Sequence, residues 1–128
     1  MANEYIRKDE ESVSLQLAKQ YLGKEVTVTV DRALGSSHPK HGFVYPVNYG
    51  YLEGVRAPDG EDLDAYVLGV HEPLASFTGR CVAIVHRHND DDDKLVVVPK
   101  ESTFSKAEIA EATRFQEQWF ESDIIMHK

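Results

Sequence analysis

Four carboxylates stand within six positions of this 128-residue chain, at Asp59, Glu61, Asp62 and Asp64. Like charges this close raise one another's pKa and cost stability unless a cation neutralises them. Mg²⁺ prefers oxygen ligands and keeps several waters, so a few carboxylates from a turn suit it. Gly60 allows a bend that brings Asp59 and Glu61 together. The segment predicts a magnesium site at Asp59, Glu61 and Asp64, although Asp and Gly are also typical of an exposed β-turn.

Histidines offer a competing metal site. His86 and His88 precede a run of aspartates, and His38 and His41 lie in a segment with turn-forming residues. Imidazole is a ligand of zinc, nickel and manganese. Because Arg87 separates the first pair and no second cluster accompanies them, we interpret these histidines as solvated loop residues.

The acidic turn needs strands to position it. Alternation over Val26–Val30 predicts a strand with its valines on one face, and 65–70 is a short apolar strand that the acidic turn enters. Two more apolar strands, 81–85 and 95–98, are joined by a charged loop and predict a hairpin.

Helices are expected at both ends of the chain. The first is capped by Asp9 or Ser12 and runs to about Tyr21, and the spacing places Val13, Leu17 and Tyr21 on one face. The second begins at a capping box, Ser105 to Glu108, and closes the chain. The residues at helical spacing are Ile109, Ala112, Phe115 or Gln116, and Trp119. For Phe115, Trp119 and Phe120, packing of the helix is favoured over a stacking platform.

Length and composition fit one α+β domain over residues 1–128, a small antiparallel sheet or barrel flanked by N- and C-terminal helices. The net charge of −8 argues against binding nucleic acid or anionic membrane. No apolar run is long enough to span a bilayer and no signal peptide is evident. Cys81 is the single cysteine, expected in the core, and it fits a cytoplasmic location.

Two segments around the acidic turn reveal a family resemblance. Residues 45–51, Tyr-Pro-Val-Asn-Tyr-Gly-Tyr, stand upstream, and Asp92-Asp93-Lys94-Leu95 stands downstream. A Tyr-Pro-x-Asn-Tyr-Gly segment followed by Asp-Gly-Asp-Pro-hydrophobic-Asp marks the soluble, family I type inorganic pyrophosphatases. The chain resembles a shortened member of that family over 26–99. The resemblance implies an OB-like barrel and magnesium-dependent hydrolysis of pyrophosphate by a metal-activated water.

The resemblance also implies roles for individual residues. Tyr49 and Lys94 would bind phosphate, and Lys94, Tyr49, Glu61 and Asp64 would make up the catalytic group. Arg32 and Lys40 match two different anion-binding positions of the family, and both are kept as candidates. The implied metal ligands are all carboxylates: Asp59, Glu61, Asp64, Asp92, Asp90 and Asp31.

The chain departs from the family at three places. Glu61 stands where the family has the aspartate that orients or deprotonates the attacking water, and Asp62 replaces a proline. Trp119-Phe120 replaces a Tyr-Lys pair that grips the outgoing phosphate. These changes leave open a hydrolase of another small phosphoanhydride or phosphate ester, and a non-catalytic relative that binds metal or phosphate. Related bacterial enzymes are usually hexamers, so a homo-oligomer is possible.

Overall fold

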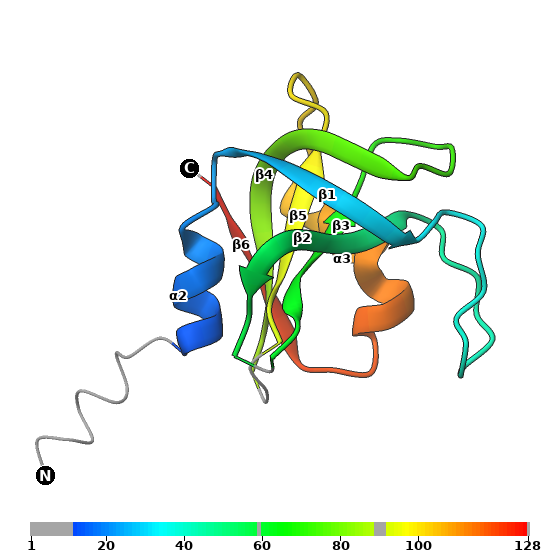
Figure 1. Ribbon diagram of the computed structural model, residues 1–128, viewed down its shortest axis with the longest axis horizontal. Helices are drawn as coiled ribbons and strands as arrows, with labels where there is room; N and C mark the ends of the chain where they lie inside the picture. Colours follow the sequence, from blue (N-terminus) through cyan, green and yellow to red (C-terminus); the bar gives the residue numbers. More distant parts are fainter. Residues whose placement is uncertain (1–11, 59, 89–91, 128) are drawn as a thin grey trace, which may run out of the picture.

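The computed structural model describes residues 12–58, 60–88 and 92–127, which form a β-barrel with two helices packed against it (Figure 1). The elements in chain order are α2 (Val13–Lys19), β1 (Glu25–Arg32), β2 (Asn48–Arg56), β3 (Asp62–Val67), β4 (Ser76–Arg87), β5 (Lys94–Val98), α3 (Lys106–Glu117) and β6 (Ser122–Met126). No helix among these residues is long and apolar enough to cross a membrane.

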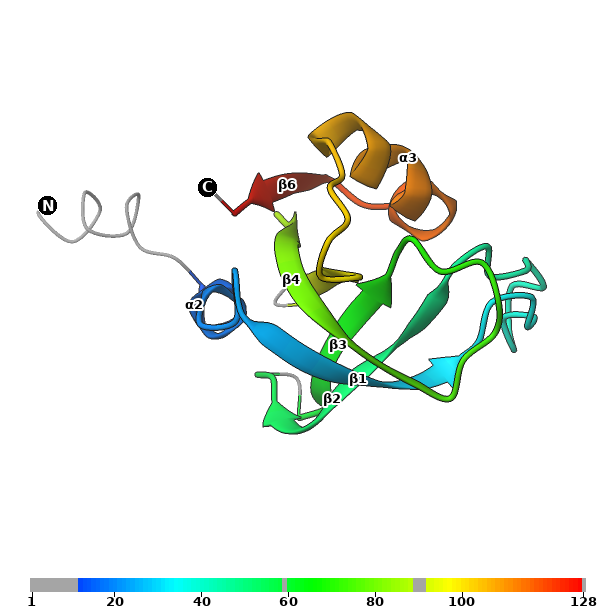
Figure 2. The same ribbon diagram turned by 90° about the horizontal axis from the view of Figure 1, so that it is seen from above.

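Five strands close the barrel in the order β1-β2-β3-β5-β4, because β1 pairs with β4 as well as with β2. The ring is seen from above in Figure 2. The β3–β5 pairing is parallel and the other four are antiparallel. The predicted fold class, an α+β domain built on a small OB-like barrel, is confirmed, with one parallel pairing that the sequence pattern did not predict.

Strand β5 is buried along its whole length because both of its faces are covered. Leu95 and Val97 point into the barrel with Val28 and Ile84. The alternate residues Val96 and Val98 belong to a second cluster outside the barrel, which includes Ile109 of α3. The continuous apolar run 95–98 therefore marks a strand between two cores, and Lys94 continues its outer face.

The first helix begins as predicted at Ser12, whose Oγ accepts a hydrogen bond from the Leu15 N–H. Its packing face was predicted in part. Leu17 and Tyr21 pack against the barrel core as expected, but Val13 is 67% exposed, and the most buried apolar residues are Leu15 and Ala18. Ser14 is also buried, and its Oγ accepts a hydrogen bond from the Asp93 N–H, which ties α2 to the end of the β4–β5 loop.

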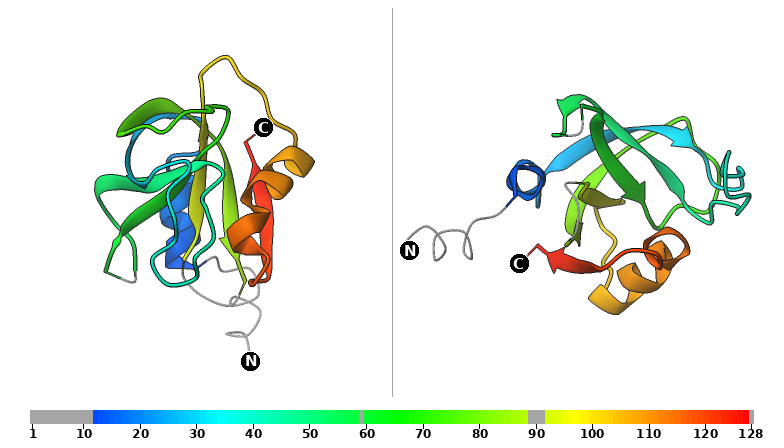
Figure 3. Two further views of the ribbon diagram at one scale, coloured as in Figure 1. Left: turned by 90° about the vertical axis from the view of Figure 1, so that its right-hand side faces the viewer. Right: turned by 90° about the horizontal axis from the view of Figure 1, so that it is seen from below.

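The second helix has the predicted capping box between Ser105 and Glu108. It does not close the chain. Strand β6 follows it and pairs antiparallel with the free edge of β4, as the two views of Figure 3 show. The helix and β6 lie on the outside of the barrel, on the side away from β1 (Figure 2).

Two residues of the Tyr-Pro-x-Asn-Tyr-Gly segment have structural roles. The buried Asn48 side chain accepts hydrogen bonds from the Leu34 and Leu74 N–H groups and donates one to the Glu72 carbonyl oxygen, so it joins two loops. At Gly50 a Cβ atom would overlap the Thr29 carbonyl oxygen. These neighbours hold the β1–β2 pairing and fix the position of Tyr49 between them.

Candidate functional site

A cavity of about 630 Å³ opens on the outer face of the barrel, beside the C-terminal end of α3. Its lining residues are Asp31, Arg32, His38, His41, Phe43, Tyr45, Tyr49, Asp64, Arg87, Asp92, Lys94, Gln116, Trp119 and Phe120. Three of them are carboxylates and three are permanent cations, so the formal charges of the lining cancel.

Six of the residues singled out from the sequence line this one cavity: Asp31, Arg32, Tyr49, Asp64, Asp92 and Lys94. They come from β1, β2, β3, the start of β5 and, for Asp92, the loop before β5. Strand pairing explains their convergence, since Tyr66 of β3 pairs with both Tyr49 and Val96, which places Asp64 and Lys94 near one another on the outer face. The barrel thus brings together residues that are up to 63 positions apart in the chain, Asp31 and Lys94.

A bulge in β1 lets two consecutive residues face the cavity. Val30 pairs with Gly50 and Arg32 pairs with Tyr49, so Asp31 is an extra residue with no partner in this ladder. A bulge re-aims the side chains around it. Asp31 and Arg32 consequently both line the cavity, where strict alternation would separate them onto opposite faces.

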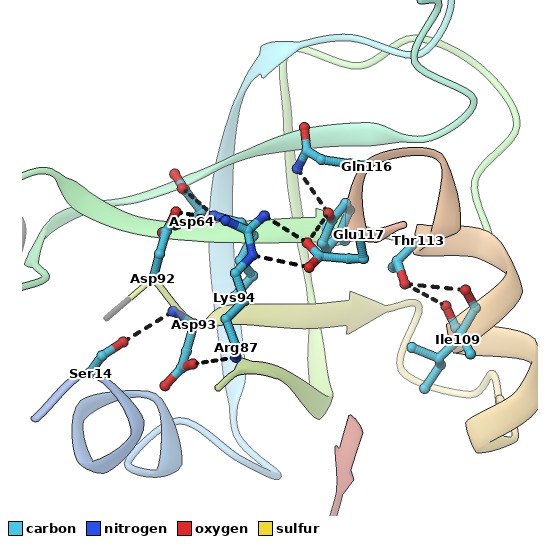
Figure 4. Close-up of polar contacts among 12 residues, drawn as sticks. Ser14, Asp64, Arg87, Asp92, Asp93, Lys94, Ile109, Thr113, Gln116 and Glu117 are labelled. Atoms are coloured by element: carbon cyan, nitrogen blue, oxygen red, sulfur yellow. Dashed lines mark hydrogen bonds and ion pairs between the residues drawn. The ribbon is translucent and has the colours of Figure 1, made fainter. Parts of the chain in front are cut away.

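Lys94 links the two carboxylates at the centre of the site (Figure 4). Its Nζ donates to Asp64 Oδ2 at 3.0 Å and to Asp92 Oδ1 at 2.9 Å. The lysine side chain is 3% exposed, whereas the carboxylate side chains are 31% and 34% exposed. Both carboxylates therefore remain open to the cavity while their positions are fixed from below by a buried ammonium.

Burial raises the pKa of Asp31, and the charge of Asp64 raises it further, while Arg32 acts in the opposite direction. Asp64 therefore acts electrostatically on the Asp31 carboxyl group, which lines the same cavity. Burial also raises the pKa of Tyr49 well above its ordinary value, with additional contributions from Asp64 and Asp92. The Tyr49 phenol stays protonated and is a hydrogen-bond donor.

Two of the predicted site residues that the structure describes, Glu61 and Lys40, are not brought to the cavity. Glu61 is exposed and lies in the β2–β3 turn, where its carbonyl oxygen accepts a hydrogen bond from Ala57 N–H. Lys40 is exposed and is not among the lining residues. Asp59 and Asp90 lie outside the described residues. Gly60 has a φ of 89°, which agrees with the bend expected there.

Arg87 is a cavity residue that the sequence did not indicate. Its Nε and Nη2 donate to the two oxygens of Glu117 at 3.0 Å each, and its Nη1 donates to Asp92 Oδ2 at 3.1 Å (Figure 4). Burial alone would lower its pKa, but Glu117 and Asp92 outweigh burial and raise it. Strand alternation could have indicated Arg87 from the sequence, because it places Arg87 on the face of the strand opposite to His86 and His88.

The arginine is held by a buried network that reaches α3. The Tyr66 hydroxyl donates to Glu117 Oε2 at 2.6 Å, and Gln116 Nε2 donates to the Tyr66 hydroxyl at 2.8 Å. Arg87 and Glu117 side chains are each 6% exposed. This network fixes the helix end against the site.

The aromatic pair at the end of α3 does not pack as predicted. Trp119 is 61% exposed and Phe120 is 43% exposed, and both follow the last helical residue, Glu117. Phe115, by contrast, packs against the core cluster around Ile109, as expected. Leaving the helix re-aims the following side chains, so helical spacing gave the wrong face for Trp119 and Phe120, which line the cavity instead.

The histidines divide into two groups. His38 and His41 line the cavity with ring centroids 4.7 Å apart. His86 Nδ1 lies 2.9 Å from Asp93 Oδ1, and His88 is exposed. In the described part of the chain, no three His, Cys, Asp or Glu side chains are grouped so that they could hold a metal ion.

The sequence model of the inorganic pyrophosphatase family matches residues 9–124. Two proteins named inorganic pyrophosphatase, from Saccharolobus solfataricus and Sulfolobus acidocaldarius, are 31% and 32% identical over 88 residues, which cover 66% of this chain and 48% of each relative. The chain spans about half the length of these curated relatives.

Solved structures share the fold at lower identity. The inorganic pyrophosphatase of Ehrlichia chaffeensis has a TM-score of 0.65 at 20% identity and covers 83% of this chain and 88% of that chain. The Helicobacter pylori enzyme has a TM-score of 0.63 at 16% identity, over 80% and 84% of the two chains. With the family match across most of its length, the chain belongs to the inorganic pyrophosphatase family.

Proposed function

We propose that the cavity binds pyrophosphate together with magnesium and hydrolyses it to two phosphates. The observation that carries the proposal is the convergence of three carboxylates and three cations from different strands in one cavity of a pyrophosphatase-family chain. A lining with no net formal charge has little attraction for a bare polyanion or a bare cation at long range. It suits a pair of opposite charges, such as a metal ion with its phosphate ligands.

Two of these carboxylates, Asp64 and Asp92, fit a hard cation. Asp64 and Asp92 meet at Lys94 Nζ, and each is about one third exposed, so oxygens of both face the cavity. Carboxylate oxygens with open positions for water are the ligands Mg²⁺ prefers. We assign metal binding to Asp64 and Asp92, with Asp31 as a third carboxylate at the same cavity. Asp59 and Asp90 stay predicted ligands.

Three donors are assigned to phosphate oxygens. Lys94 and Arg32 supply positive charge, and the protonated Tyr49 supplies a neutral hydrogen bond. Fixed donors of this kind stabilise the charge that develops on phosphoryl oxygens during transfer. The lining position of Arg32 favours it over the exposed Lys40 for this role.

When bound, magnesium supplies positive charge to the phosphates and lowers the pKa of a coordinated water. The chain's own contribution is to orient that water and accept its proton. The family pattern assigns the role of proton acceptor to Glu61. That role stays a prediction, because Glu61 lies in the β2–β3 turn and is not among the residues that line the cavity. Asp64, on the adjoining strand, is one of the three carboxylates that line the cavity.

Release of phosphate from pyrophosphate tests the proposal, with Mg²⁺, Mn²⁺ and Zn²⁺ compared side by side. The expected result is release above background that requires the divalent ion. Stabilisation against heat by magnesium and phosphate without turnover would instead indicate a non-catalytic relative. A cytoplasmic location and a homo-oligomeric assembly stay predictions.

A second candidate is a hydrolase of another small phosphoanhydride. The observation that favours it is the replacement of the family's Tyr-Lys pair by Trp119 and Phe120, which line the cavity and cannot donate a charged hydrogen bond to phosphate. A substrate panel that includes organic diphosphates separates the two candidates.

A further inference from the structure

One wall of the cavity is aromatic and is built from two distant segments. Phe43, His38 and His41 come from the loop after β1, and Trp119 and Phe120 follow α3. Trp119 lies 5.9 Å from Phe43 between ring centroids, with 28° between the planes, and 6.3 Å from His41.

The cavity is rich in the chain's large rings. Five of the chain's 12 Phe, Trp and Tyr residues line it, including the only tryptophan, and three of the five belong to the aromatic wall: Phe43, Trp119 and Phe120. Trp119 and Phe120 keep 61% and 43% of their surface exposed, although burial of an aromatic side chain is favourable. Two large rings of the cavity lining thus keep much of their surface exposed, although the same lining also carries charged side chains.

Inorganic pyrophosphate leaves this wall unused, because it has no apolar surface and no ring. The charged residues and the aromatic wall line the same cavity of about 630 Å³, a volume within the range of pockets that hold small-molecule ligands. A ligand that matches both sets of residues carries a phosphoanhydride at one end and a planar ring at the other. Flat rings gain from stacking on Trp or Phe whatever their identity.

Arg87 joins the charged residues to the aromatic wall. Its guanidinium carbon lies 3.7 Å from the centroid of the Phe120 ring, while the same side chain donates to Asp92 and Glu117. The arginine therefore contacts the Phe120 ring and is hydrogen-bonded to Asp92 and Glu117, which fixes the distance between the ring and these carboxylates. Trp119 is the ring left with the larger exposed surface.

We propose that the preferred substrate is a nucleoside diphosphate or triphosphate whose base stacks on Trp119 while its terminal phosphates lie at Lys94 and Arg32. The inference rests on the second candidate function, hydrolysis of another small phosphoanhydride at the same cavity, and names its substrate class. Water attacks the terminal phosphorus, the bond from that phosphorus to the bridging oxygen breaks, and the nucleotide shortened by one phosphate leaves with inorganic phosphate and one proton.

The inference is tested with two substrates, ADP and methyl diphosphate, each with Mg²⁺. They share the diphosphate and differ in the group attached to it, which is adenosine in one and methyl in the other. Stacking of one base is worth ~1–3 kcal/mol, so ADP should have a KM roughly 5- to 150-fold lower than methyl diphosphate. Trp119→Leu keeps an apolar side chain and removes the ring, and it should bring the two KM values together. Trp119→Phe should restore part of the difference. Val44→Ala, an exposed residue of the same loop outside the cavity lining, should leave the ratio unchanged.

Binding without turnover gives an independent measurement, because Trp119 is the only tryptophan. Its fluorescence should be quenched by ADP at concentrations where methyl diphosphate has little effect, with correction for light absorbed by the base. ADP quenching without hydrolysis of any substrate would keep the ring site and overturn the proposed hydrolase. Pyrophosphate hydrolysis with equal KM and equal quenching for both probes would overturn the ring site alone. A change of sedimentation coefficient in Trp119→Leu with an unchanged KM ratio would also overturn it, because the wall would then be an interface between copies of the chain.

Discussion

Lys94 Nζ lies 3.0 Å from Asp64 Oδ2, and this buried ammonium also holds Asp92 at 2.9 Å. One residue thus pairs with both carboxylates assigned to the metal and is itself assigned to phosphate. Its removal should separate the two functions of the site.

Lys94→Met keeps the length of the side chain and removes its charge. Phosphate release should fall about 100-fold or more, because loss of one charge-stabilising donor costs that much in comparable sites. Mg²⁺ should bind more tightly, because Asp64 and Asp92 both lose the Lys94 charge and, among the described residues, only Asp92 keeps a cationic ion-pair partner, Arg87. Titration calorimetry with Mg²⁺ and a phosphate-release assay measure the two effects. Lys100→Met is the control, since Lys100 pairs with Glu25 and lies outside the cavity lining. Weaker magnesium binding in Lys94→Met would contradict the assignment.

Glu117→Leu should destabilise the protein by about 3–5 kcal/mol, because it leaves the buried Arg87 without its bidentate partner. The double variant Arg87→Met, Glu117→Leu should recover most of that loss, since no buried charge is then unpaired. Urea unfolding of the single and double variants measures the coupling. Equal stability losses in both would show that the pair contributes through packing alone.

Gly50→Ala should cost about 2–3 kcal/mol of unfolding free energy, because the added methyl overlaps the Thr29 carbonyl oxygen of the neighbouring strand. Gly50 follows Tyr49 and pairs with Val30 at the β1 bulge, so the strain should displace site residues and lower activity along with stability. Gly42→Ala is a comparison in which nothing lies within 4 Å of the added Cβ, although its φ of 75° also disfavours alanine. A Gly50→Ala protein as stable as the wild type would refute the β1–β2 register.

The stability of the protein should fall as pH rises above 10. Burial, and next the charge of Glu117, raise the pKa of Tyr66 well above 10.0. The unfolded tyrosine releases its proton near its ordinary pKa while the folded one keeps it, so the unfolded state is favoured as pH increases. Tyr66→Phe should flatten this decline, although it also removes the hydrogen bond to Glu117. Urea unfolding between pH 8 and pH 11 checks the slope, and an identical slope in both proteins would contradict it.

Much of the fold follows from local patterns. The alternation around Val26 and Val28, the Ser12 cap, the capping box at Ser105 and the β4–β5 hairpin were predicted and are confirmed. Cys81 is buried in the core, as expected, and burial raises its pKa to about 11. These features depend on neighbours in the sequence, which is why periodicity and caps reveal them.

The features that could not be predicted from the sequence depend on tertiary contacts. Strand β6 exists because β4 offers a free edge, and no local signal in 122–126 distinguishes it from a tail. The buried face of α2 follows from docking through Leu15 and Ala18. Arg87 lies in the site because it forms hydrogen bonds with Glu117 and Asp92, which belong to other parts of the chain. Trp119 lines the cavity because α3 ends two residues before it, at Glu117.

Phosphate release from pyrophosphate with Mg²⁺, compared between the wild type, Asp64→Asn and Glu61→Gln, tests the central claim most directly. Asp64 lies at the cavity and Glu61 does not, so Asp64→Asn should reduce the rate far more than Glu61→Gln. Both variants keep the size of the side chain, and their unfolding curves control for stability. A wild-type rate that exceeds background and is lost in Asp64→Asn is the predicted result. Unchanged phosphate release by Asp64→Asn would contradict the account.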